Sequence, residues 1–257
     1  MNHEKLLAIF YPLVVACGFI CSVTTAVAWN HWKYVLDTCV SSSYSSIYEV
    51  NCGCILKGLS TITYFIGGHV GYCHWATFGL LLPIFVAIIF GCYHVWRVCF
   101  GVRRRRYAQH TVRQRSADII VMTAKTEMTD NEISPYWWIP ASVAAIIMFI
   151  YAVVHASMYL DGFLQSCRQY RNEIVKYVHA SGPLVAAIHG RLTCSSVFDF
   201  MDYLHPDVSF DRRRIDRINT AVCLILGLIT AWVGVFLWLG IFIINVIQAR
   251  RSRNLRV

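Results

Sequence analysis

The chain has 257 residues, of which 57% are hydrophobic and only 14% are charged, and its formal net charge is +9. Soluble domains usually carry roughly 25% charged residues. A chain so poor in charge has too little polar surface to coat a soluble core, so the composition excludes an ordinary soluble protein and favours a membrane protein.

Four apolar runs provide the predicted membrane spans. Each is free of Asp, Glu, Lys and Arg and is longer than the roughly 20 residues that cross a hydrocarbon core of about 30 Å. Lipid offers the backbone no hydrogen-bond partner, so each run should be helical. We predict one all-α membrane domain over residues 1–257, a four-transmembrane-helix bundle with spans at about 7–29, 75–98, 136–160 and 219–246.

The first span also resembles a secretory signal peptide, because Lys5 precedes an apolar stretch that ends in Ala26-Val27-Ala28. The apolar core of a signal peptide is about 7–15 residues long. This stretch is longer, so we expect a retained span.

Basic residues follow the second and fourth spans. Loop 99–135 begins with a run of arginines, and the short tail carries four more. Basic loops stay on the cytosolic side, so we predict a plasma-membrane protein with loop 99–135 and both termini in the cytosol. Loops 30–74 and 161–218 are then extracellular. The arginines of segment 212–217 oppose this orientation, although acidic residues alternate with them.

The run in the inner loop consists of Arg103, Arg104, Arg105 and Arg106. Such a run contacts anionic lipid headgroups of the inner leaflet at about 1 kcal/mol per residue. Binding of calmodulin or another cytosolic partner by residues 103–122 is the alternative.

Cysteines gather in the two outer loops, which contain Cys39, Cys52, Cys54, Cys73, Cys167 and Cys194. An even number of cysteines in an oxidising compartment favours disulfides, although the sequence does not select the pairing. The simplest set joins Cys167 to Cys194, Cys54 to Cys73 and Cys39 to Cys52. We therefore predict a small disulfide-pinned extracellular cap.

The loops themselves show secondary-structure signals. Between residues 45 and 68, β-branched and aromatic runs alternate with glycines, which indicates a short β-hairpin in the first outer loop. In the last outer loop, 163–179 should continue the third span as a helix, and 195–204 should form another. The acidic residues Asp199, Asp202, Asp207 and Asp211 lack the spacing of a calcium loop, so we expect a solvated face.

Small residues recur at helical spacing on the last two spans. They are Ala141, Ala145, Ala152 and Ala156 on the third span and Gly227, Ala231 and Gly234 on the fourth. Small residues let helices approach closely in lipid, so these faces should close the bundle or, alternatively, dock onto another membrane protein. We expect the large side chains of Trp232, Phe236 and Trp238 to face lipid or that partner.

The spans contain little that could perform chemistry. Apart from Arg97 at the very end of the second span, their only ionisable side chains of the acid, base or imidazole kind are His94 and His155, which lie near opposite ends of their spans. A shared metal site is therefore not expected, and each should be a neutral, hydrogen-bonded histidine. Phosphate-binding loops, nucleophile elbows and paired carboxylates do not occur in the sequence. We predict no enzymatic activity, no cofactor, no metal and no nucleic-acid partner.

A sparse pattern of loop and span-edge residues resembles the transmembrane protein 179 family. It comprises Cys54-Ile55-Leu56-Lys57-Gly58, Cys73, Cys167, Cys194-Ser195, Phe200, Tyr203-Leu204-His205, Trp232 and Leu237-Trp238. The resemblance implies a four-span protein with cytosolic termini and implies no enzymatic activity.

Taken together, these features favour a non-catalytic auxiliary or interaction subunit of an ion-channel or receptor complex. A pore-forming protomer of a large-pore channel is the first alternative, because Cys52-Gly53-Cys54 with Cys167 and Cys194 is similar to the calcium homeostasis modulators. Against it, a pore needs a polar face, and the first span offers only Ser22, Thr24 and Thr25. A membrane enzyme or lipid-handling protein, with a pocket around His74 and His155, is the second.

Overall fold

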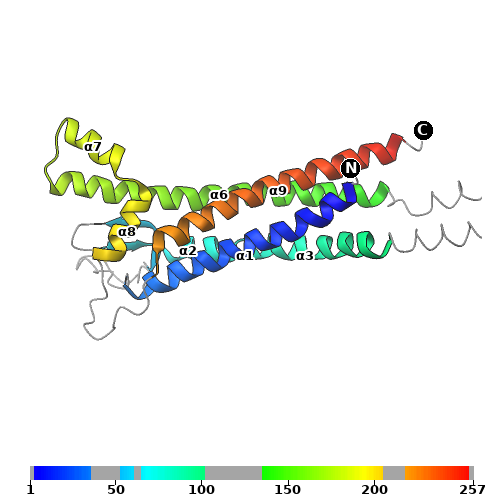
Figure 1. Cartoon of the computed structure of the whole chain (residues 1–257), viewed down its shortest axis with the longest axis horizontal. Helices are drawn as coiled ribbons and strands as arrows, with labels where there is room; N and C mark the ends of the chain where they lie inside the picture. Colours follow the sequence, from blue (N-terminus) through cyan, green and yellow to red (C-terminus); the bar gives the residue numbers. More distant parts are fainter. Residues whose placement is uncertain (1–2, 36–52, 61–64, 102–134, 205–217, 255–257) are drawn as a thin grey trace, which may run out of the picture. The chain divides into compact units, whose positions relative to one another are not determined.

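The computed structural model describes residues 3–35, 53–60, 65–101, 135–204 and 218–254. They form an all-α four-span protein with one small antiparallel sheet (Figure 1), which confirms the predicted fold class. The elements are α1 (His3–Val35), β1 (Cys54–Ser60), β2 (Phe65–Gly68), α2 (Val70–Phe78), α3 (Leu81–Trp96), the π-helix η1 (Arg97–Gly101), α6 (Pro135–Tyr177), α7 (Pro183–Arg191), α8 (Cys194–Leu204) and α9 (Thr220–Asn254).

Four helical stretches are long and apolar enough to cross a membrane, which makes this a multi-pass membrane protein. They cover His3–Lys33, Val70–Phe100, Trp137–Tyr177 and Thr220–Arg251. Their outer faces carry large apolar side chains such as Phe19, Phe85 and Phe236, which are 65%, 62% and 66% exposed. A water-soluble protein rarely presents such a continuous apolar surface, whereas the hydrocarbon of a bilayer solvates it.

The chain divides into two compact units, and α1, α6 and α9 each contribute a segment to both. Unit 1 combines Met1–Ala16, Pro83–Tyr151 and Gly234–Val257, and unit 2 combines Cys17–Leu82 and Ala152–Val233. Each unit has its own buried interior.

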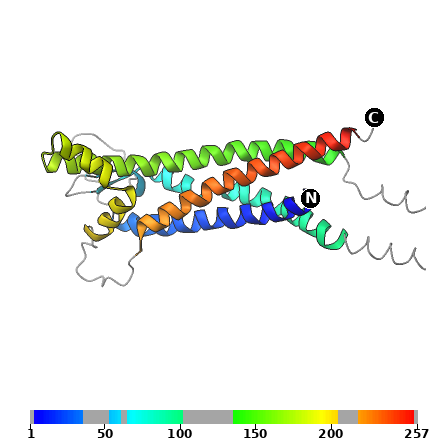
Figure 2. The same ribbon diagram turned by 45° about the horizontal axis from the view of Figure 1, so that its top comes forward.

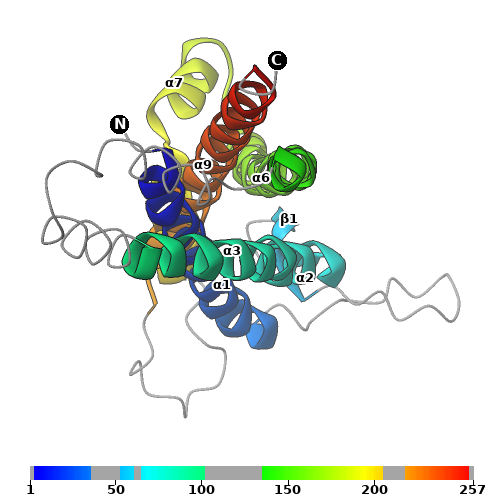
Figure 3. The ribbon, with the colours of Figure 1, turned by 90° about the vertical axis from the view of Figure 1, so that its right-hand side faces the viewer.

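The interior of unit 1 is aromatic. The Tyr11 ring stacks on His94 at 5.7 Å and meets the edge of Trp238 at 6.1 Å, and His94 in turn stacks on Trp138 at 6.1 Å. These contacts join the unit 1 segments of α1, α3, α6 and α9, whose ends face the viewer in Figure 3. The expectation that Trp238 faces lipid or a partner is therefore wrong, since its side chain is 2% exposed and fills this core.

The interior of unit 2 contains small residues and two consecutive hydrogen bonds made by buried hydroxyl groups. Thr25 of α1 donates to the Tyr159 hydroxyl (3.1 Å), which donates to the Leu224 carbonyl of α9 (3.2 Å). Gly227 allows this approach, because a Cβ there would lie 2.7 Å from the Tyr159 oxygen. One buried tyrosine of α6 thus ties α1 to α9.

The second span is interrupted between α2 and α3. Pro83 has no N–H to offer the Gly79 carbonyl, so the α-helical ladder cannot run through this point. Gly79 also lets His155 of α6 approach, because a Cβ on Gly79 would lie 2.8 Å from the imidazole. The His155 Nε2 atom then lies 3.3 Å from the Ala76 carbonyl oxygen, which agrees with the hydrogen-bonded histidine predicted for this position.

Candidate functional site: the disulfide-braced cap

The candidate site lies at the end of unit 2 that carries the sheet. We call it the cap and define it as β1, β2, residues 161–177 of α6, α7 and α8. Its β-hairpin pairs Cys54 with Gly68 and Ser60 with Phe65, which agrees with the hairpin predicted for the first outer loop.

The hairpin is irregular at Lys57, whose backbone has a left-handed φ of 59°. This backbone conformation is costly for a residue other than glycine. Two contacts of the Lys57 side chain hold it in place. The Lys57 Nζ atom lies 2.9 Å from a carboxylate oxygen of Asp161 and 4.5 Å from the centroid of the Tyr72 ring. The ion pair raises the pKa of the Lys57 ammonium group, with Asp161 as the main cause.

Ser166 fastens the hairpin to α6. Its hydroxyl donates to the Ile55 carbonyl (2.9 Å) and accepts from the Gly58 amide (3.1 Å). Gly162, one helical turn earlier, lets the β-strand approach, because a Cβ there would lie 3.1 Å from the Leu56 Cβ. The hydroxyl thus satisfies two backbone groups at the irregular part of β1.

Two disulfides brace the cap. Cys54–Cys73 joins β1 to α2, and Cys167–Cys194 joins α6 to α8. The second disulfide holds α8 beside α6 (Figure 2). The rings of Phe163 and Phe198 stack at 5.0 Å. Both pairs belong to the simplest set predicted from the sequence, whereas Cys39 and Cys52 lie outside the described residues.

The far end of α8 is held by Asp202. Its carboxylate accepts from the Thr220 amide (2.8 Å) and from the Thr220 hydroxyl (2.5 Å), and that hydroxyl accepts from the Trp32 indole (2.8 Å). This cluster, which we call the Asp202 latch, connects α8 to the first residues of α9 and the last turns of α1. Burial raises the pKa of the Asp202 carboxyl, and the Thr220 bonds offset part of that rise.

The expectation of a solvated acidic face is therefore wrong for Asp202, whose carboxylate bonds to Thr220. It agrees with the structure for Asp199, which is exposed. Asp207 and Asp211 lie outside the described residues. The latch was not visible in the sequence, because its three side chains are far apart in the chain and only folding brings them together.

A helical arm projects between the cysteines of the second disulfide. It consists of residues 168–193, which include the last part of α6, a turn and α7. The turn uses left-handed backbone at His179 (φ 49°) and Gly182 (φ 56°), and Pro183 begins α7. Sequence analysis missed α7, although Gly182-Pro183 is a typical helix start. None of the nine residues of α7 is buried among the described parts of the chain.

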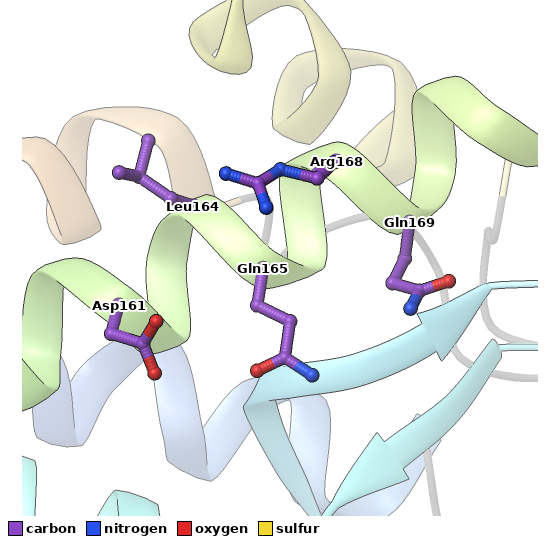
Figure 4. A pocket seen from close by; sticks show the side chains of 5 residues that line it. All are labelled: Asp161, Leu164, Gln165, Arg168 and Gln169. Atoms are coloured by element: carbon purple, nitrogen blue, oxygen red, sulfur yellow. The ribbon is translucent and has the colours of Figure 1, made fainter.

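A shallow hollow lies on the α6 part of the cap. It has a volume of about 260 Å³ and is lined by Asp161, Leu164, Gln165, Arg168 and Gln169. Figure 4 shows that Asp161, Gln165 and Gln169 point towards the sheet, whereas Arg168 lies over a different face of the helix. All five residues come from one helix, so the hollow is an open surface and not an enclosed binding pocket.

The remaining predicted site residues lie elsewhere. Ala141, Ala145, Ala152, Ala156, Gly227 and Ala231 are buried, so they serve packing within the chain, whereas Gly234 is half-buried and has open space at its Cβ position. The run 103–106 lies outside the described residues. The ring nitrogens of His94 lack a hydrogen-bond partner among the described residues, contrary to the hydrogen-bonded state predicted for it, because aromatic rings surround this imidazole. The described residues bring together no cluster of three potential metal ligands.

Comparison with protein-family models, curated proteins and solved structures finds no match to this chain. The resemblance to the transmembrane protein 179 family stays a prediction.

Proposed function

We propose that this protein is a non-catalytic subunit that assembles with another membrane protein, such as an ion channel or a receptor, in the plasma membrane. The observation that carries the proposal is the helical arm. Isolated helices of nine residues are unstable in water, and α7 buries no residue against the described chain. A binding partner would supply the packing that α7 lacks.

The construction of the cap supports the same function. Ser166 and the Cys167–Cys194 disulfide join parts of the cap to one another, whereas the Cys54–Cys73 disulfide and the Asp202 latch join the cap to α2, α9 and α1. A surface held so firmly loses little conformational entropy on binding, which favours affinity. The arm is therefore presented on a rigid base.

The buried polar groups of unit 2 also favour a structural role. The hydroxyls of Thr25, Tyr159 and Ser166 bond to a backbone carbonyl or to one another, and the Thr220 hydroxyl bonds to the Asp202 carboxylate and the Trp32 indole. These groups join helices and do not surround a cavity. A catalytic role would require them to face a substrate, so an interaction function fits their arrangement better.

Two chemical signals, the disulfides and the basic segments, favour one orientation of the chain in the membrane. This orientation is part of the proposal. Disulfides form in the oxidising extracellular compartment, which favours a cap outside the cell. The basic run between α3 and α6 and the arginines of the tail favour a cytosolic location for the other end. Both termini would then be cytosolic.

The function is tested by extracting the full-length chain from native membranes in mild detergent and analysing the particle by size-exclusion chromatography and mass spectrometry. We expect another membrane protein at a fixed ratio to this chain. A matched variant replaces residues 183–191 by a Gly/Ser linker of equal length, which keeps both disulfides but should lose the partner.

A large particle that contains only this chain would refute the auxiliary function and favour the pore-forming alternative. A monomer with turnover that depends on His155 would favour the enzyme alternative. Labelling of an introduced cysteine at each terminus, with an impermeant reagent on intact cells, tests the orientation.

A further inference from the structure

The helical arm carries an excess of positive charge. Between Cys167 and Cys194 the chain contains four basic residues, Arg168, Arg171, Lys176 and Arg191, and one acidic residue, Glu173. Lys176 pairs with Glu173 at 2.6 Å, so the single carboxylate of the arm is already engaged. The three arginines have no ion-pair partner among the residues that the structure describes.

The second disulfide gathers the arginines at the base of the arm. Arg168 and Arg171 follow Cys167 by one and four residues, and Arg191 precedes Cys194 by three. The Cα atoms of the two cysteines are 5.4 Å apart. The disulfide therefore brings together, at the base of the arm, the two chain segments that carry the three arginines.

Arg171 shows the shortage of anions most clearly. Its Nη2 atom lies 3.7 Å from the Cys194 sulfur, a weak acceptor, and its buried Nε atom has no hydrogen-bond partner among the described residues. A guanidinium has five N–H donors in a planar fork that matches a carboxylate. A part-buried guanidinium without a carboxylate is unfavourable, so pairing of Arg171 with a carboxylate would be favourable.

Exposed apolar side chains lie towards the tip of the arm, where α6 ends and α7 begins. Tyr177, Val178 and Leu184 are 69%, 52% and 48% exposed. Large exposed apolar side chains on a projecting element are typical of a surface that contacts another protein. Free phosphate or sulfate would use the arginines but leave these side chains in water.

The arm stands clear of the bilayer to which the chain belongs. Helix α6 has 43 residues, which corresponds to about 65 Å at 1.5 Å per residue. A hydrocarbon core takes up only about 30 Å of that length, and the charged residues of α6 begin at Asp161. The part of α6 that precedes α7 therefore extends beyond the length that the hydrocarbon core takes up, where a protein can reach the arm.

We propose that the arm, through Arg168, Arg171 and Arg191 with Tyr177 and Leu184, binds an acidic segment in the extracellular part of the membrane-protein partner. This inference rests on the proposed function and names the chemistry of the contact. The partner's carboxylates pair with the three guanidinium groups, and its apolar side chains cover α7.

The test compares the full-length chain with R168E, R171E and R191E, singly and together, by quantifying the partner that co-purifies from cell membranes. K176E is the matched control, because it changes the charge by the same amount at a residue already paired within the arm. Each arginine substitution should lower partner recovery roughly tenfold or more, as loss of a buried charge contact does. K176E should change partner recovery less than threefold. With the wild-type chain, partner recovery should fall as ionic strength rises.

A second measurement does not depend on a disruptive substitution. R191K keeps the positive charge and adds a primary amine, so a carbodiimide can join that amine to a neighbouring carboxylate as an amide with loss of water. The linked peptide, identified by mass spectrometry, should contain an Asp or Glu of the partner.

The outcomes separate the two proposals. If a partner co-purifies equally with all arginine variants, the docking surface is refuted while the subunit function stands. The binding of an acidic protein segment by the arm is also refuted if R191K links only to acidic residues of this same chain. The same holds if removal of sulfated glycans releases the partner. If no partner co-purifies with the wild type, the subunit function itself fails.

Discussion

The Asp202 latch offers the sharpest test of how the cap is attached to the spans. The substitution Thr220→Val removes one hydroxyl and preserves the shape of a side chain that is fully buried. That hydroxyl donates to Asp202 and accepts from the Trp32 indole. The Thr220 amide still reaches the carboxylate after the substitution, so the perturbation is confined to the side chain.

The expected cost follows from the two bonds. A hydrogen bond to a charged group contributes about 1.5–3 kcal/mol, and a neutral one contributes about 0.5–1.5 kcal/mol. Thr220→Val should therefore lower the free energy of unfolding by roughly 2–4 kcal/mol. Thr220→Ser keeps the hydroxyl and loses one methyl group, for a cost of about 1 kcal/mol.

Equilibrium unfolding of the full-length chain in mixed micelles, followed by tryptophan fluorescence, measures both variants. A double-mutant cycle with Asp202→Asn isolates the bond between the two side chains, and its coupling energy should exceed about 1 kcal/mol. The reasoning is refuted if Thr220→Val is as stable as Thr220→Ser, because the hydroxyl would then contribute nothing beyond its volume.

Three further predictions concern the same unit and its neighbours. Gly227→Ala should destabilise the protein by about 1–3 kcal/mol, because the added Cβ would meet the Tyr159 oxygen at 2.7 Å. Gly234→Ala, with nothing within 4 Å of its Cβ, should be no less stable than the wild type in the same equilibrium-unfolding assay. Cys54→Ser should lower the free energy of unfolding by about 3 kcal/mol, since the lost disulfide closes a loop of 19 residues; an unchanged midpoint under non-reducing conditions would contradict this. The raised pKa of Asp202 means that the folded state holds this proton more tightly than the unfolded state, so stability should fall as pH rises from about 4 through the folded-state pKa. Asp202→Asn should remove that part of the pH profile, and an identical slope in wild type and variant would count against the assignment.

Several features of this protein could be predicted from residue types and their spacing alone. The four apolar runs are long enough to span a bilayer, and a helix is the only form in which a lone segment satisfies its backbone in lipid. The β-hairpin and the extension of α6 followed from local patterns in the same way. Two disulfide pairs were the simplest choice, because they join neighbours along the chain.

Tertiary structure decided the features that depend on which residues meet. The inward position of Trp238 depends on the rotation of α9 about its own axis, and an apolar span has no polar face that would reveal this rotation. The break after Gly79 combines a local cause, Pro83, with the approach of His155 from another helix.

The sequence by itself determined that four segments lie in lipid and roughly where these spans begin and end, because hydrophobicity and length act locally. Folding decided which distant residues meet. Asp202, Thr220 and Trp32 form one latch only when three helices converge, and the segments that carry Arg168, Arg171 and Arg191 come together only when a disulfide closes the arm. Such contacts join residues far apart in the chain, and only packing in three dimensions selects them.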